Sequence, residues 1–167
     1  MSRYESPEYE IKDKVDEFEL REYKEFYIVE YESESDPDLS YAFGTLFKYI
    51  GRGNDQNEQI NMTIPVIKEV TTNGLKMAFV VPQSKWQNIP HPTDKRLKIT
   101  RFDKGLFATI TYTGLSTSAK EKKQIQLLDT WIADKQLSII SNFMIAIYNG
   151  PYILPMLRRN EIIVRVE

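Results

Sequence analysis

A weak internal repeat most strongly constrains how this chain can fold. Phe18–Tyr23 alternates apolar and polar residues as a half-buried strand does, and Leu97–Phe102 repeats the pattern in the second half. Each run is followed by a second extended segment rich in β-branched and aromatic residues, Phe26–Tyr31 and Phe107–Tyr112. Recurrence of the same order at a spacing of roughly eighty residues predicts two structurally related halves.

A helix is expected after each pair of strands. The first helix should begin near Pro37, because proline suits the first helical turn and Asp36 can cap the free amides there. Gly51 and Gly53 should end it. Its predicted apolar stripe consists of Leu39, Phe43, Leu46 and Ile50. The second helix opens with the spacing of a capping box, Ser118 and Glu121. Its stripe consists of Ile125, Leu128 and Ile132.

Two further strands should follow each helix. They are expected over residues 62–70, 75–81, 139–148 and 161–166, and Asn73-Gly74 is a strong hairpin signal. The resulting order, two strands, a helix and two strands, occurs twice, in repeats at about 8–82 and 96–167. The predicted fold is α+β, a pseudo-twofold distorted antiparallel β-barrel or sheet with two packed helices, formed by one domain over residues 1–167.

Composition excludes several classes of protein. No apolar run approaches the roughly 20 residues of a membrane span, so no integral membrane association is expected. The first twenty residues contain no secretory signal, and the lack of cysteine excludes disulfides, thiolate catalysis and Cys-ligated metals. We therefore expect a cytoplasmic protein. A net charge of -2 with interspersed signs argues against a nucleic-acid partner.

Three dispersed motifs carry a family resemblance. They are Met62–Val66, Phe79–Pro82 and the C-terminal stretch Tyr148–Glu161, which precedes the apolar run Ile162-Ile163-Val164. In this order they closely resemble the signature of the SOUL haem-binding protein family, over about Tyr9 to Val166. The resemblance implies a pseudo-twofold barrel with two helices, similar to the effector-binding domains of bacterial transcription regulators. It also implies haem or another porphyrin as the ligand.

The resemblance directs attention to the first helix, because haem in this family is thought to lie in a shallow apolar cleft along it, with basic side chains near the propionates. Phe43 and Phe47 lie one turn apart and could stack on a flat ring, while Gly44 would let the ring approach. Lys48 lies seven residues after Tyr41, hence on the same side, where it could meet a propionate. The alternative is that both phenylalanines are core residues and Lys48 is a solvated charge.

Iron ligation has few candidates. Some family members have a histidine at the first helix, whereas residues 36–51 contain none here. The single histidine, His91, lies between Pro90 and Pro92 and could supply an axial ligand, although an exposed loop residue is the ordinary interpretation. Tyr41 or Tyr49 could ligate as a phenolate if its pKa were lowered. We expect haem or another porphyrin to bind without strong axial ligation.

The functional hypothesis is a soluble tetrapyrrole-binding protein that carries, buffers or senses porphyrin. A small-molecule effector domain for amphipathic cations and an enzyme acting on haem or porphyrin remain alternatives. No acid, base or nucleophile set is recognisable, which favours binding over catalysis. Arg158, Arg159 and Glu161 suggest either an anion site or local ion pairs next to the last strand. The sequence does not specify an oligomeric state.

Overall fold

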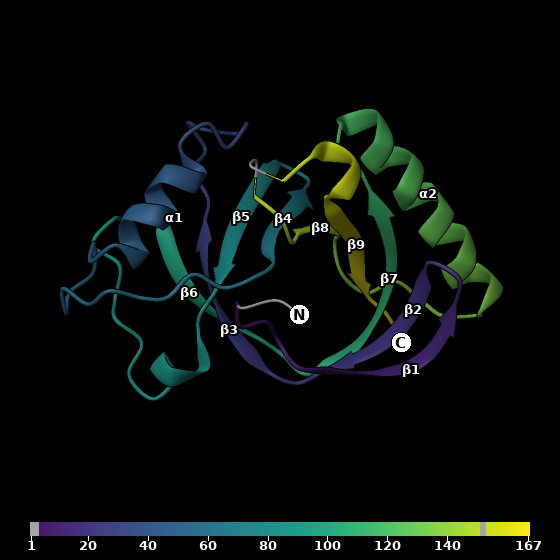
Figure 1. Cartoon of the computed structure of the whole chain (residues 1–167), viewed down its shortest axis with the longest axis horizontal. Coiled ribbons are helices and arrows are strands. Elements are labelled where there is room, and N and C mark those ends of the chain that lie inside the picture. The colour runs from purple at the N-terminus through teal and green to yellow at the C-terminus, as the bar shows by residue number, and fades with distance from the viewer. Residues whose placement is uncertain (1–3, 151–152) are drawn as a thin grey trace. The chain divides into compact units, whose positions relative to one another are not determined.

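The computed structural model describes residues 4–150 and 153–167, which form nine strands and two α-helices (Figure 1). They divide into two compact units. Unit 1 comprises the N-terminal residues up to Pro7 and Glu25–Asp103, and unit 2 comprises Glu8–Lys24 and Lys104–Glu167. Each unit has an antiparallel sheet with one helix packed against it. The predicted α+β class is therefore confirmed.

Unit 1 carries the first helix. Its strands lie in the order β4, β5, β3 and β6, with bounds Val66–Thr71, Gly74–Val80, Phe26–Tyr31 and Leu97–Phe102. Helix α1 (Ala42–Ile50) packs on β3 and β5, and the short 3-10 helix η1 (Gln83–Lys85) follows β5. The helix buries Ala42, Thr45, Leu46, Tyr49 and Ile50.

Unit 2 has an equivalent sheet with one added strand. The order is β8, β9, β7, β2 and β1, with bounds Met144–Ile147, Arg159–Arg165, Gly105–Thr113, Phe18–Tyr23 and Tyr9–Val15. Helix α2 (Ser118–Asp134) packs on β7 and β9, and the 3-10 helix η2 (Pro155–Leu157) precedes β9 (Figure 1). Leu128 and Ile132 of α2 are buried among strand residues that include Ile110, Ile145 and Val164. The predicted stripe of α2 thus forms its core face.

The two units share a topology through a reciprocal exchange of strands. In the first repeat β2 belongs to unit 2 and pairs with β7, while in the second repeat β6 belongs to unit 1 and pairs with β3. The segments that begin at Phe18 and Leu97 therefore pair in equivalent ways, as the repeat predicts. The chain passes between units at Pro7-Glu8, at Lys24-Glu25 and at Asp103-Lys104. Consequently neither unit is one continuous stretch of sequence.

The start of the first helix was wrongly predicted. Residues 36–41 form turns, and α1 begins at Ala42, because Leu39 has a φ of 61° and is not helical. Asp36 does cap amides, but they are those of Ser40 and Tyr41 just before the helix. Phe43 was predicted to belong to the buried stripe, but it lies on the exposed side of α1.

Smaller differences occur at other element ends. The N-cap of α2 is Thr117, whose side chain accepts a hydrogen bond from the Lys120 amide, so the cap lies one residue before the predicted Ser118. The β4–β5 hairpin is present, with Thr71 opposite Gly74, so Thr72 and Asn73 form its turn. The last three predicted strands are present with shifted bounds, and β4 begins at Val66 where the prediction had residue 62. No helix of the described residues is long and apolar enough to cross a membrane.

Candidate functional site

A buried carboxylate positions the entrance to α1. Asp36 accepts hydrogen bonds from the Ser40 amide (2.8 Å), the Tyr41 amide (2.9 Å) and the Tyr31 hydroxyl (2.8 Å). Burial alone would raise the pKa of Asp36, but these donors outweigh burial and lower it. The ionised side chain therefore fixes the turn that presents Tyr41 and the first residues of the helix.

An exposed aromatic face runs along α1. Phe43 and Phe47 are 48% and 52% exposed, and their rings stack with centroids 5.7 Å apart. Phe43 also meets the buried Phe79 of β5 edge-on at 5.5 Å, so its ring is held in place. Apart from its two chain neighbours and the backbone of its own helix, Gly44 between them has no atom within 4 Å of the position that a Cβ would occupy. With Tyr41, which is exposed too, these residues form the aromatic face of α1.

Lys48 is exposed on the same helix and acts on a neighbouring carboxylate. The pKa of Asp94 falls to about 2, mainly because Arg96 donates hydrogen bonds to it and to a smaller extent because of the charge of Lys48. Arg96 binds Asp94 at 2.7 Å and also reaches Tyr31 and Thr45 at 3.4 Å. A ligand carboxylate at Lys48 would therefore compete with Asp94.

His91 is not among the residues of this face. It is exposed, its amide donates to the Asp55 carboxylate (2.8 Å) and its carbonyl accepts from the Asp55 amide (2.9 Å). Neighbouring Pro90 accepts a hydrogen bond from the Tyr49 hydroxyl at 2.6 Å. The contacts of this loop thus lie with the end of α1 and the segment after it, whereas Tyr41, Phe43, Phe47 and Lys48 all belong to α1 and its N-cap.

Tyr49 is unsuitable as a phenolate ligand. Its side chain is buried and its pKa is raised to about 12, because burial disfavours the charged form and Asp55 adds to this effect. A phenolate ligand needs the opposite shift. Among the described residues there is also no group of three or more His, Asp or Glu that could hold a metal ion.

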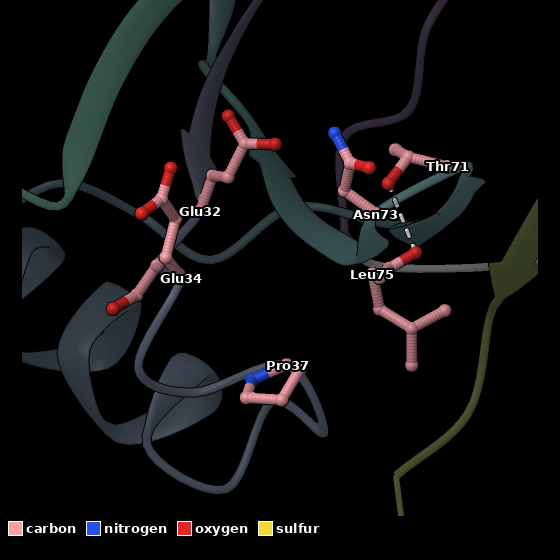
Figure 2. Close-up of a pocket in the computed structure, with 8 residues that line it drawn as sticks. Glu32, Glu34, Pro37, Thr71, Asn73 and Leu75 are labelled. Carbon is pink, nitrogen blue, oxygen red and sulfur yellow. Dashed lines mark hydrogen bonds between the residues drawn. The ribbon is translucent and has the colours of Figure 1, made fainter.

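Two hollows in unit 1 have polar linings. The first, of about 300 Å³, lies beside the β4–β5 hairpin, and Figure 2 shows Glu32 and Glu34 on one side of it and Asn73 on the other. The second, of about 420 Å³, is lined by residues that include Glu5, Met62 and Pro82, from the N-terminal segment and two of the sequence motifs. Carboxylates in both linings would repel an acidic ligand.

Unit 2 contains a buried ionic cluster that sequence reasoning largely missed. The guanidinium of Arg21 binds both carboxylate oxygens of Glu161, and both side chains are fully buried. Glu161 also accepts hydrogen bonds from Tyr148 (2.6 Å), Thr111 (3.1 Å) and Arg159 (3.0 Å). These donors saturate the carboxylate, which confirms the structural interpretation of the Arg159–Glu161 pair.

The electrostatics of this cluster keep Glu161 ionised. Burial would raise the pKa of Glu161, but the hydrogen bonds and charge of Arg21, with help from Tyr148 and Arg159, lower it to about 2. Burial likewise raises the pKa of Tyr23, a further partner of Arg21, to about 12. The cluster therefore holds its charges in internal pairs, where they are unavailable to a cationic ligand.

The signal for this cluster was present in the strand pattern. In β2, Glu19, Arg21 and Tyr23 occupy alternate positions and are buried, while Phe18 and Leu20 on the other face pack against the core near α2. When a strand is covered on both faces but one of these faces is polar, its sequence shows the same alternation as a half-buried strand. Only the position of Glu161, 140 residues away in sequence, shows why the polar face can be buried.

Comparison with known families identifies the chain. The family model described as SOUL heme-binding protein matches residues 4–165. The chain belongs to the SOUL family. Membership accounts for the three motifs, two of which line the second hollow of unit 1 while the third leads into β9.

Solved structures show that other proteins share this SOUL fold at low sequence identity. The EcmrR C-terminal domain is 12% identical, with a TM-score of 0.65 over 90% of this chain and 96% of that chain. A hydrolase from Listeria innocua is also 12% identical, with a TM-score of 0.64 over 93% of this chain and 94% of that chain. At this identity the similarity concerns the fold alone. No curated protein matches the chain significantly.

Proposed function

We propose that this SOUL protein binds haem or a related tetrapyrrole on the aromatic face of α1 and carries, buffers or senses it. The observation that supports this most directly is the pair of stacked, half-exposed rings of Phe43 and Phe47 around the open position at Gly44. Leaving such apolar surface in water costs about 25 cal/mol per Å². A flat macrocycle laid on this face would remove both rings from water and gain stacking contacts.

Lys48 supplies the polar half of this interaction. Its ammonium lies on the exposed side of the helix, where it can meet a propionate at the edge of a macrocycle. The contact is solvent-exposed and competes with Asp94, so it is worth only about 1 kcal/mol. Ring stacking therefore supplies most of the affinity, and the carboxylates orient the ligand.

Iron should contribute little to binding. His91 lies in a loop whose backbone binds the segment after α1, outside the helix that carries the face, and Tyr49 is buried with a raised pKa, so we expect neither to ligate iron there. We expect metal-free protoporphyrin to bind within about tenfold of haem, a difference of at most about 1.4 kcal/mol.

The cation-sensor alternative finds less support in the buried cluster of unit 2. A buried carboxylate that receives an amphipathic cation must have unused acceptor capacity, whereas Glu161 is neutralised by Arg21 and saturated by further donors. Hydrophobic cations should therefore bind more weakly than porphyrins.

Titration of the purified protein with haem, protoporphyrin, a neutral porphyrin ester and tetraphenylphosphonium tests the proposal. Phe47→Ala and Gly44→Leu should each weaken protoporphyrin at least about tenfold, by removing a stacking ring or obstructing it. Lys48→Glu should weaken the dicarboxylates several-fold and leave the ester unchanged, whereas Lys98→Glu, the same charge change on β6, should have no effect. Unchanged binding in Phe47→Ala and Gly44→Leu would reject the aromatic face as the site.

A further inference from the structure

An exposed apolar turn stands at one end of unit 2. Leu154, Met156 and Leu157, around η2, are between 62% and 74% exposed. We call these three side chains the apolar tip. Leu115, in the loop before α2, is exposed as well. Large apolar side chains gathered this way on a surface mark an interaction site more often than isolated ones do.

Basic residues lie in the two segments that adjoin the apolar tip, the end of η2 and the start of α2. The Gly114 amide donates to the Arg158 carbonyl at 3.1 Å, which joins the end of η2 to the loop that leads into α2. The ammonium of Lys120 in the first turn of α2 contacts the carbonyl of Thr113 in the same region. We call four basic residues of these segments the basic rim; they are Lys120, Lys122, Lys123 and Arg158.

Acidic side chains are scarce in the same region. Residues 113–124 and 153–158 contain all four members of the basic rim but only one acidic residue, Glu121. Glu121 is buried and accepts a hydrogen bond from Ser116. This end of unit 2 is therefore positively charged, although the whole chain has a net charge of -2.

The three lysines of the basic rim are placed against the preference of their own helix, α2. Three lysines lie within the first six residues of α2, where the helix dipole disfavours positive charge, and the last residue of the helix is Asp134. Helix stability thus offers no reason for lysines at this end. Binding to an anionic partner would explain their position.

We propose that the apolar tip and the basic rim dock on an anionic lipid surface. The tip would enter the interfacial region of the bilayer, and the rim would contact lipid phosphates and carboxylates at the same depth. Neither signal alone gives firm attachment, but a small apolar insertion combined with several basic residues does. This role is independent of tetrapyrrole binding, since it uses residues of unit 2 while the aromatic face belongs to unit 1.

Sedimentation of the full chain, free of porphyrin, with lipid vesicles tests this proposal. One set contains phosphatidylcholine alone, and the other contains about one third phosphatidylserine. The wild type should sediment with the second set, and less so as salt is raised. Binding should fall at least about tenfold in a tip variant and in a rim variant. The tip variant carries Leu154→Ser, Met156→Ser and Leu157→Ser, and the rim variant carries Lys122→Glu and Lys123→Glu.

A control variant separates the tip from general surface hydrophobicity. Leu127→Ser changes an exposed leucine of α2 that lies outside the tip and should bind as the wild type does. Circular dichroism verifies that all variants are folded. The proposal would be overturned if the wild-type protein did not sediment with the phosphatidylserine vesicles, or if the tip and rim variants sedimented as fully as the wild type. So would concentration-dependent self-association that the tip variant abolishes without any vesicle binding, because the tip would then join copies of the chain.

Discussion

Replacing Arg21 with methionine should reveal how strongly the buried cluster of unit 2 depends on its ion pair. Both Arg21 and Glu161 are fully buried, and removing one partner of such a pair costs about 3–5 kcal/mol. After the change Glu161 keeps the donors Tyr148, Thr111 and Arg159, whereas the buried Glu19 loses its hydrogen bond from Arg21 (2.8 Å), so the expected loss stays within about 3–5 kcal/mol. That is a large part of the stability of a typical domain.

A double variant isolates the coupling between the two side chains. Arg21→Met with Glu161→Leu leaves neither charge unpaired, so it should cost about 2 kcal/mol less than the sum of the single changes. Urea unfolding supplies the free energies, followed by far-ultraviolet circular dichroism. The fluorescence of Trp131, which stacks on Phe18 within unit 2, reports on this unit. A loss below about 1 kcal/mol in Arg21→Met, or strict additivity, would refute the reasoning.

The same cluster predicts a pH dependence. The pKa of Glu161 is about 2 in the folded protein, below its ordinary value of 4.5, so the unfolded chain binds a proton on this group at higher pH. Its stabilisation, about 3 kcal/mol, is complete above pH 4.5 and is lost as the pH falls towards 2. Glu161→Gln should therefore show a flatter dependence of unfolding free energy on pH in that interval. An unchanged slope would show that the carboxylate titrates normally.

Three further outcomes are expected. Gly44→Ala should raise the unfolding free energy by about 0.5–1 kcal/mol, because the position is helical, exposed and open, and a lower melting temperature would contradict this. Thr117→Ala should cost about 1 kcal/mol in urea unfolding through loss of the α2 cap, whereas an equal loss in Ser118→Ala would place the cap one residue later. His91→Ala should leave the visible spectrum of the haem complex nearly unchanged. A low-spin spectrum that this variant abolishes would make His91 an iron ligand.

Secondary structure was the most predictable level of this protein. Period-two alternation predicted β2 and β6 to the residue, because an extended strand alternates its side chains between two faces wherever it pairs. The β-branched and aromatic residues of Phe26–Tyr31 predicted β3 equally well. Helix periodicity was less informative for α1, since Leu39 adopts a positive φ and the helix is only nine residues long. In so short a helix the spacing of apolar residues is compatible with more than one choice of the buried face.

Which face of α1 would be buried depended on tertiary packing. The aromatic residues Phe43 and Phe47 fit a core stripe as well as an exposed surface, and contact of α1 with β3 and β5 selected Ala42 and Tyr49 for the interior instead. The sequence and its family resemblance therefore predicted the candidate residues of the aromatic face. Their exposure and stacking follow from the packing of α1.

By itself the sequence determined most of the elements, the repeat and the family, all of which depend on local periodicity or on motifs within short segments. Strand β1 and the start of α1 were not among the elements it determined. Tertiary structure alone decided that β2 and β6 are exchanged between the repeats, because strand pairing depends on contacts between distant segments. It also decided that Arg21 and Glu161 meet. Each looks like a surface charge in its own strand, and only the pairing of β2, β7 and β9 gives each a partner that makes burial favourable.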